Sequence, residues 1–299
     1  MASFGNSRIV KINVDTAALT TFVASGVGGL ASPSALTFGP DGNLYVSNQG
    51  NASVLRFNGA TGASMGTFVS SGSGGLLTPW GLTFGPNGNL YVVSATNQVL
   101  QYNGATGAFV GIYVGGLGPG PGANLNDPRD LLFLPNGQLL VTSRGNNVIN
   151  RYSTTGSIIG PFNDNSGIAA PWGITLGRNG NVYVARTNTE VRVIEYDVNT
   201  GKYIRAFVRG DTSLTAPTTF AIRPASPNDS DGDGLPDSCG VEPCPADIFP
   251  PGPGNGNGTV DINDVLHLVA NWGAPGSGNP AHLNHDGTVN ILDLLIMIA

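Results

Sequence analysis

The sequence predicts an all-β fold, a five-bladed β-propeller, followed by a small α-helical calcium-binding module. Three observations predict it. One motif recurs four times, each copy carries the signals of four short strands, and the partial copies at the two ends complement one another. Four strands in ~45 residues is the size of one propeller blade. The expected domains are a propeller (1–224), an acidic calcium-binding linker (225–246) and the helical module (247–299).

Each repeated unit begins at a proline. "PSALTFGPDGNLYV" (33–46) returns as "PWGLTFGPNGNLYV" (79–92), "PRDLLFLPNGQLLV" (128–141) and "PWGITLGRNGNVYV" (171–184). Asp-Gly or Asn-Gly between two apolar runs predicts a hairpin, because both turn positions favour positive φ. A third strand, such as 54–57, and a fourth strand after a Thr-Gly turn, such as 66–69, complete the unit.

The two ends of the repeat array are incomplete. Residues 2–16 match the late part of a unit, 46–61, so the chain is expected to begin inside a second strand. "PTTFAIRP" (217–224) supplies a first strand without the rest of its unit. Joining the two would complete a fifth blade, with 217–223 inside and 8–13 and 18–23 outside. Such closure removes exposed sheet edges.

The units resemble NHL-type propeller repeats over residues 2–224, and "GPDGNLYV" carries the resemblance. It implies an architecture and no single activity, since this scaffold hosts binding modules, lyases and lactonases. Propeller lyases of the streptogramin and amidating types use His, whereas residues 1–224 contain neither His nor Cys. The carboxylates of this region are scattered, and no cluster of three for a lactonase-like metal site emerges. An enzyme is therefore less favoured than a binding protein.

The residue after each leading proline is expected to face one mouth of the central channel. These residues are Ser34, Trp80, Arg129, Trp172 and Thr218. Two indoles and a guanidinium can stack on a sugar or another planar ligand, so the candidate ligand-binding residues are Trp80, Arg129, Asp130 and Trp172. Alternatively, the tryptophans are wedges buried between blades. Arg129 would then form a local ion pair with Asp127 and Asp130, worth about 0–1 kcal/mol if exposed.

Composition favours an extracellular protein. Charged residues make up 11% of the chain, far below the ~25% of ordinary soluble domains. The only cysteines, Cys239 and Cys244, lie in an acidic tail and predict a local disulfide, or else two free thiols. No signal peptide is visible, and we expect one upstream of Met1 in the native protein. No apolar run of ~18 residues predicts a membrane span, and no basic stripe predicts nucleic-acid binding.

The tail, residues 225–299, contains no Lys or Arg, so its many acids require a cation. "DSDGDGLPD" places three acids at alternate positions and a fourth acid four residues later, after a glycine turn, which suits the six to eight oxygen ligands of Ca²⁺. The expected ligands are Asp229, Asp231, Asp233 and Asp237. The loop resembles the calcium repeats of thrombospondin type 3 stalks. The alternative is a solvated acidic linker.

Two further loops follow, each running into an apolar stripe at helical spacing. "NGTVDINDVL" (257–266) aligns with "DGTVNILDLL" (286–295). The expected Ca²⁺ ligands are Asp247, Asn255, Asn257, Asp261 and Asp264 in the first loop, and Asn284, Asp286, Asn290 and Asp293 in the second. Such short helices are unstable alone, so metal binding and helix pairing should fold the module together.

This duplicated loop-helix resembles the dockerin type I module over about residues 247–299. The resemblance implies attachment to a cohesin-like partner or another surface scaffold protein. His282 replaces the usual first aspartate of the second loop, and Ile262-Asn263 replaces a common Ser-Thr recognition pair. We therefore expect a secreted, non-catalytic propeller with a calcium-dependent attachment tail and a glycan at its mouth. The alternatives are a carbohydrate- or lactone-active hydrolase docked to a cohesin-like scaffold, and a structural surface protein.

Overall fold

The computed structural model describes residues 2–12, 18–115, 125–163, 168–187 and 191–209, all within a compact unit that spans Met1–Ile222. The expected first strand of the fifth blade (217–223), the linker and the helical module lie outside the described residues. No helix in the described part of the chain is long and apolar enough to cross a membrane.

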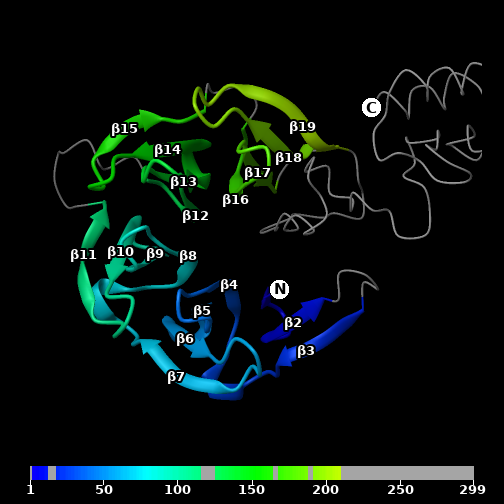
Figure 1. Cartoon of the computed structure of the whole chain (residues 1–299), viewed down its shortest axis with the longest axis vertical. Helices are drawn as coiled ribbons and strands as arrows, with labels where there is room; N and C mark the ends of the chain where they lie inside the picture. The colour runs from blue at the N-terminus through cyan, green and yellow to red at the C-terminus, as the bar shows by residue number, and fades with distance from the viewer. Residues whose placement is uncertain (1, 13–17, 116–124, 164–167, 188–190, 210–299) are drawn as a thin grey trace, which may run out of the picture. The chain divides into compact units, whose positions relative to one another are not determined.

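The described strands form five antiparallel sheets (Figure 1). Blade one contains β4 (Pro33–Phe38), β5 (Leu44–Asn48), β6 (Ser53–Phe57) and β7 (Ser64–Val69). Blade two contains β8 (Pro79–Phe84), β9 (Leu90–Ser94), β10 (Gln98–Tyr102) and β11 (Phe109–Val114). Blade three contains β12 (Pro128–Phe133), β13 (Leu139–Ser143), β14 (Val148–Tyr152) and β15 (Ile158–Pro161). Blade four contains β16 (Pro171–Leu176), β17 (Val182–Arg186), β18 (Val191–Tyr196) and β19 (Tyr203–Arg209).

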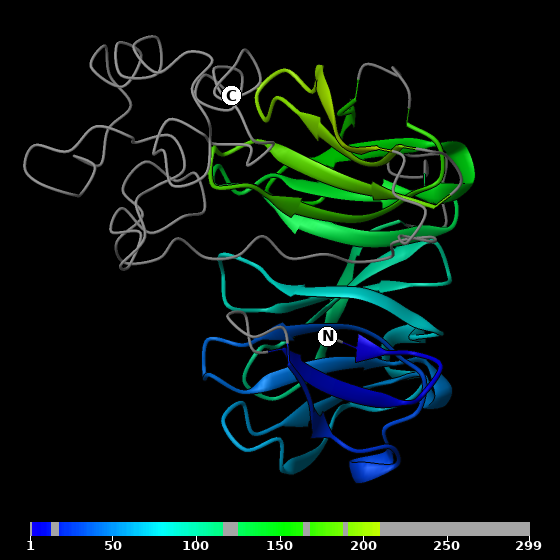
Figure 2. The ribbon, with the colours of Figure 1, turned by 90° about the vertical axis from the view of Figure 1, so that its right-hand side faces the viewer.

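The fifth sheet lies at the N-terminus. It contains β1 (Ala2–Ser3), β2 (Arg8–Ile12) and β3 (Leu19–Val23), and β1 pairs with β2 as a second strand pairs with a third. The chain therefore begins within a second strand, as the sequence predicted. The five sheets are arranged radially, with the first strand of each complete blade innermost and the fourth outermost (Figures 1 and 2). The all-β, five-bladed propeller is confirmed.

The hairpin turns between first and second strands differ from the expected geometry. Only the glycine of each Asp-Gly or Asn-Gly pair has positive φ, for example 73° at Gly42. Asp41 instead accepts a hydrogen bond from the backbone N–H of Asn43 (3.1 Å), and the Gly39 N–H donates to the Asn43 carbonyl (2.8 Å). The turn is thus a longer hairpin loop with one left-handed residue. The prediction of two positive-φ positions was wrong.

Apolar side chains from neighbouring blades form the core. Tyr45 of blade one lies edge-on between Phe68 and Phe84, with ring centroids 4.8 and 4.9 Å away. Tyr91 of blade two lies in the same way between Tyr113 and Phe133, at 4.7 and 4.8 Å. Edge-to-face aromatic pairs contribute about 0.5–1.5 kcal/mol beyond their area burial. The period-two pattern of each strand therefore packs one blade onto the next.

The Thr-Gly turns form a second contact between blades, made by the main chain. An added Cβ at Gly62 would collide with the carbonyl oxygen of Phe22 on the preceding blade, and one at Gly107 with the carbonyl oxygen of Phe68. Blades three and four repeat the contact at Gly156 and Gly201. At Gly62 and Gly107 φ is 73° and 74°, so both space and conformation favour glycine.

Candidate functional site at the channel mouth

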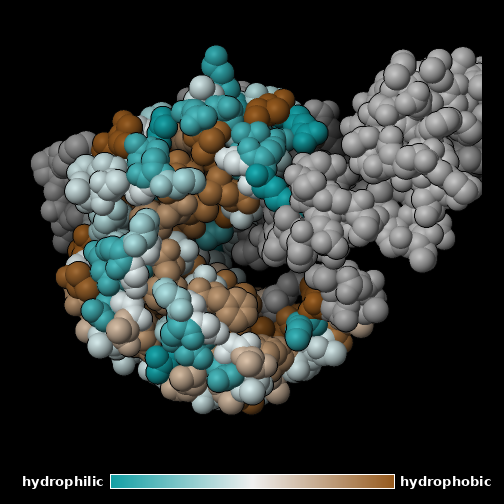
Figure 3. All heavy atoms as spheres, in the orientation of Figure 1, coloured by the Kyte–Doolittle hydropathy of each residue, from teal (hydrophilic) through white to brown (hydrophobic). Residues whose placement is uncertain are grey.

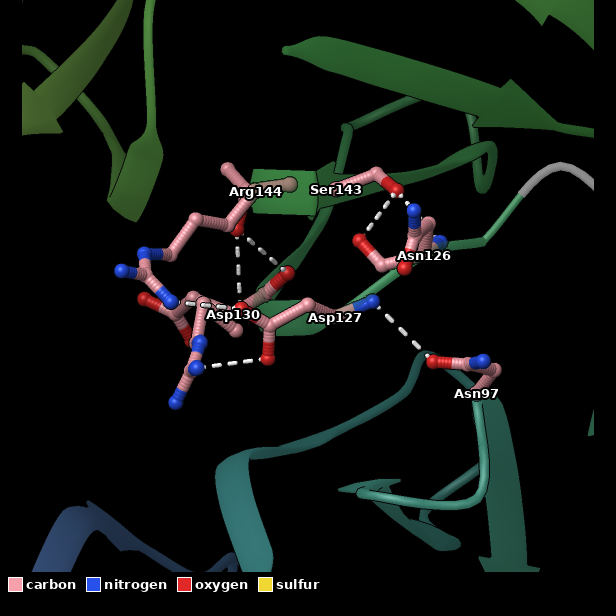
Figure 4. Close-up of polar contacts among 8 residues, drawn as sticks. Asn97, Asn126, Asp127, Asp130, Ser143 and Arg144 are labelled. Carbon is pink, nitrogen blue, oxygen red and sulfur yellow. Dashed lines mark hydrogen bonds and ion pairs between the residues drawn. The ribbon is translucent and has the colours of Figure 1, made fainter. Parts of the chain in front are cut away.

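The mouth is formed where the first strands of the blades begin. The residue before each leading proline has positive φ, between 40° and 52°, and these residues are Ser32, Thr78, Asp127 and Ala170. Such a conformation costs about 1–3 kcal/mol at a non-glycine residue. Hydrogen bonds from the preceding blade hold it: the N–H of Asp127 donates to Asn97 Oδ1 (3.0 Å; Figure 4), and that of Ala170 donates to Asn147 Oδ1 (2.8 Å).

The structure brings three of the four candidate mouth residues into one stack. The Arg129 guanidinium carbon lies 3.8 Å from the ring centroid of Trp80 and 4.4 Å from that of Trp172. The two indoles are edge-to-face to each other, with centroids 5.6 Å apart. The three side chains come from β8, β12 and β16, which are the first strands of consecutive blades. A cation over an aromatic face contributes about 0.5–2 kcal/mol, more when desolvated.

The expected alternative for Trp80 is also visible. Trp80 is partly buried against the apolar cluster between blades two and three, which includes Tyr91 and Val141. It therefore acts as a wedge on one side and a stacking partner on the other. Hydrophobic side chains gather beside β12 and β13 on the inner side of the ring (Figure 3). Trp80 and Trp172 both retain partial exposure at the mouth.

Asp127 is the counter-ion of the stack. Its carboxylate pairs with Arg129 Nη2 (2.5 Å) and with Arg144 Nη1 (2.7 Å). Burial alone would raise the pKa of Asp127, but hydrogen bonds from the two guanidiniums hold that pKa below its usual value. Arg129 is only 8% exposed, and burial lowers its pKa against the opposing effect of Asp127. The ion pair between Arg129 and Asp127 is as predicted from sequence.

The guanidinium of Arg129 is not fully satisfied by hydrogen bonds. Its Nε and Nη1 are buried and have no hydrogen-bond partner, so the indole faces stand in for oxygen acceptors. Two arginines share one carboxylate here, which leaves the cluster with an excess positive charge. Arg144 lies 5.3 Å above the Trp172 ring and is 40% exposed. Arg144 is therefore the part of the cluster that a ligand can reach most easily.

Asp130 does not join this ion pair, contrary to the sequence-based expectation. Its Oδ1 accepts the N–H of Leu131 (2.9 Å), and its Oδ2 accepts the N–H of Ile174 on blade four (3.1 Å). Gly81 of blade two lies so close that an added Cβ would be 2.8 Å from the Asp130 Cα. Burial raises the pKa of Asp130 to about 7, against the lowering effect of the two N–H donors. Asp130 thus links blade three to blade four.

Sequence reasoning missed three residues of this region. Arg144 directly follows β13. Its only signal in the sequence is a positive charge at a position where the other units carry the uncharged Gln49, Ala95 and Thr187. Asn97 lies in the turn before β10 and contacts Asp127 from the neighbouring blade. Thr142 accepts the N–H of Asp130 (2.9 Å) and donates to the Trp172 carbonyl (2.7 Å). Figure 4 shows the adjoining contact between Asn126 and Ser143.

The cluster contains acids, cations and aromatic faces. Within the described residues, no group of three or more His, Cys, Asp or Glu side chains could hold a metal ion. The expected calcium ligands, Asp229 to Asp293, and the Cys239–Cys244 pair all lie outside the described residues. Chemically, the mouth can stack on a flat or apolar face and bind an anionic or hydroxyl-rich group through Arg144.

Comparisons with known proteins support the fold. No family model matches the sequence, and no curated protein matches it. Virginiamycin B lyase from Staphylococcus aureus is similar in structure, with a TM-score of 0.50 and 20% identity, covering 67% of this chain and 63% of the lyase. A chain of the nidogen/laminin complex has a TM-score of 0.52 and 17% identity, covering 66% of this chain and 70% of that one. At this identity the likeness concerns the fold alone.

Proposed function

We propose that the protein is a non-catalytic binding protein of the extracellular space, whose propeller mouth holds a ligand and whose acidic tail attaches it to a scaffold. The observation that carries the proposal is the stack of Trp80, Arg129 and Trp172. It presents partly exposed indoles beside an exposed cation, Arg144, and is rigidly held by Asp127. Preorganised aromatic and cationic groups favour binding over chemistry, because among the described residues of the mouth no nucleophile lies next to a base.

A glycan is the ligand class that fits these groups best. Pyranose rings have an apolar face that stacks on indole, and their hydroxyls or carboxylates accept hydrogen bonds from a guanidinium. Structural neighbours illustrate two uses of the scaffold. One belongs to a complex of nidogen with laminin, and another is a lyase that is inactive when a histidine is replaced by alanine. Residues 1–224 of this chain contain no histidine, which supports binding rather than that lyase chemistry.

The tail completes the proposal. Residues 225–299 offer closely spaced acids without any Lys or Arg, and Ca²⁺ would convert their mutual repulsion into coordination. A folded, calcium-loaded module would then bind a cohesin-like or other surface scaffold protein. The support for this part is the sequence of the three loops.

A glycan array probed with the whole protein tests the proposal, in calcium and in chelator. Binding to a defined glycan that is lost in Trp172→Ala and weakened in Arg144→Gln supports it. The exposed Ile159→Ser variant on the outer rim is the matched control and should bind like the parent protein. Binding unchanged by both mouth variants, with folding verified by circular dichroism, would contradict the assignment of the mouth.

A second candidate function rests on Asp130. A carboxyl group with a pKa of about 7 beside a cationic cluster has the protonation properties of a general acid or base. The corresponding protein would be a carbohydrate- or lactone-active enzyme. Turnover of a glycoside or sugar lactone that disappears in Asp130→Ala, while glycan binding remains, would favour this candidate over the first.

A further inference from the structure

The charged side chains at the start of the first strands come from one blade. Three positions of each unit lie together there: the residue before the leading proline, the residue after it and the residue that follows the second strand. In blade three these are Asp127, Arg129 and Arg144. In the other complete blades the corresponding residues are all uncharged, for example Ser32 and Ser34 in blade one. The charge at these positions is therefore local to blade three, in a chain in which only 11% of the residues are charged.

Both oxygens of the Asp127 carboxylate are engaged by arginine. Oδ1 pairs with Arg129 Nη2 (2.5 Å), and Oδ2 pairs with Arg144 Nη1 (2.7 Å; Figure 4). Because one carboxylate serves two guanidiniums, one positive charge has no counter-ion among the described residues. Arg129 is 8% exposed and lies between two indoles, whereas Arg144 is 40% exposed. The uncompensated charge is thus accessible at Arg144.

Arg144 is fixed on one side and open on the other. Its backbone N–H donates to the Asp127 carbonyl (3.1 Å), and its Nη1 donates to Asp127 Oδ2 (2.7 Å). Its Nε is buried and has no hydrogen-bond partner. Its Nη2 is not buried in this way and makes no hydrogen bond with a described residue. Nη2 is therefore the donor that a ligand can reach.

An indole lies next to this donor. The guanidinium carbon of Arg144 is 5.3 Å from the ring centroid of Trp172, and Trp172 is partly exposed. In a hexuronic acid the carboxylate is bonded directly to the sugar ring. A sugar ring that contacts the exposed part of the indole can therefore place its carboxylate at Arg144 Nη2. A neutral hexose of the same shape would place only a hydroxyl there.

We propose that the mouth binds an acidic glycan that contains hexuronic acid, with a carboxylate on Arg144 and its sugar ring beside Trp172. This inference rests on the proposed function and names the class of glycan. A carboxylate accepts a charge-assisted hydrogen bond from a guanidinium, which is about twice as strong as a bond between neutral groups. It also supplies the counter-ion that the cluster lacks. A neutral glycan leaves that charge uncompensated, and a cationic ligand is repelled by it.

Calorimetric titration of the whole protein with galacturonic acid oligomers, and with the same oligomers after methyl esterification of their carboxylates, tests this inference. Chelator is present so that the carboxylates bind no calcium. The acid form should bind about tenfold more tightly than the ester, and salt should reduce this difference. Arg144→Gln should bring the ratio of the two affinities close to one. Lys202→Gln is the matched control, because it removes an exposed positive charge at the opposite end of blade four and should leave the ratio unchanged.

Several results would overturn the inference. They are equal affinities for the acid and the ester, a ratio that is unchanged in Arg144→Gln, tighter binding of a sulfated oligosaccharide than of the carboxylated one, and binding of neither oligomer. If a neutral glycan then binds on the array and Trp172→Ala abolishes that binding, the proposed function stands and only the assignment to acidic glycans fails. If no glycan binds, both fail. Circular dichroism of each variant separates lost binding from a lost fold.

Discussion

Replacing Asp130 by alanine is expected to lower the free energy of unfolding near pH 4 and to raise it near pH 8. The pKa of Asp130 is raised by burial from 3.8 to about 7 in the folded chain. The folded protein therefore holds this proton more tightly than the unfolded chain, and the contribution to stability is fully present below pH ~4 and is lost as pH rises through ~7. At ~1.4 kcal/mol per pH unit the loss is about 4 kcal/mol. This is an upper limit, because Asp130 retains partial exposure.

Alanine removes this pH dependence and also two backbone contacts. The N–H groups of Leu131 and Ile174 lose their acceptor, at a cost of about 1 kcal/mol each at every pH. Asp130→Ala should thus be about 2 kcal/mol less stable than the parent protein near pH 4. It should be up to about 2 kcal/mol more stable near pH 8. Alanine suits the position, because the corresponding residue of blade one is Ala35.

Urea unfolding of both proteins at pH 4 to 8, followed by circular dichroism in chelator, measures the difference. The free energies of unfolding should cross within this range. A difference between the two proteins that stays constant with pH would refute the reasoning, since it would mean that Asp130 titrates alike in the folded and unfolded chains.

Three further outcomes are expected. Asp127→Asn should cost about 3 kcal/mol of unfolding free energy, since it leaves a buried guanidinium without a counter-ion; a loss below ~0.5 kcal/mol in urea unfolding would contradict this. Gly81→Ala should lower the free energy of unfolding by about 1–3 kcal/mol, because the added Cβ meets the main chain of Asp130, whereas Gly111→Ala should leave it unchanged. Equal melting temperatures of the two variants would refute the clash at Gly81. Calcium should increase the helical signal of the protein in circular dichroism, and Asp233→Ala should weaken calcium binding in calorimetry. Absence of any binding heat would contradict the calcium sites and favour the alternative of a solvated acidic linker.

Much of the fold was predictable because its signals are local. An apolar strand, an Asn-Gly or Asp-Gly turn and a second apolar strand recur with each leading proline, and each produced the expected hairpin. The start of the chain inside a second strand followed from matching residues 2–16 to a complete unit. The turn conformation did not follow, because the side chain of Asp41 binds the backbone and selects a longer loop.

The site was only partly predictable, because its contacts join blades. The position after each leading proline indicated that Trp80, Arg129 and Trp172 would approach one another. Sequence spacing could not show that Arg129 would lie between the two indoles. It also could not show that Asp130 would turn away from Arg129 to the N–H of Ile174, 44 residues later. Such choices depend on strand twist and on how far each side chain reaches across the gap between blades.

The glycine turns have a consequence for how this ring can diversify. Gly62 and Gly107 meet carbonyl oxygens of the preceding blade, so the spacing between blades is set by atoms that every residue possesses. The position directly after the leading proline takes no part in this contact between glycine and carbonyl. Ser34 and Trp80 already differ there, so substitutions at this position can accumulate without moving the main-chain contacts between blades. A protein built in this way can acquire a new ligand through single substitutions at the mouth, while the contacts between its blades stay the same.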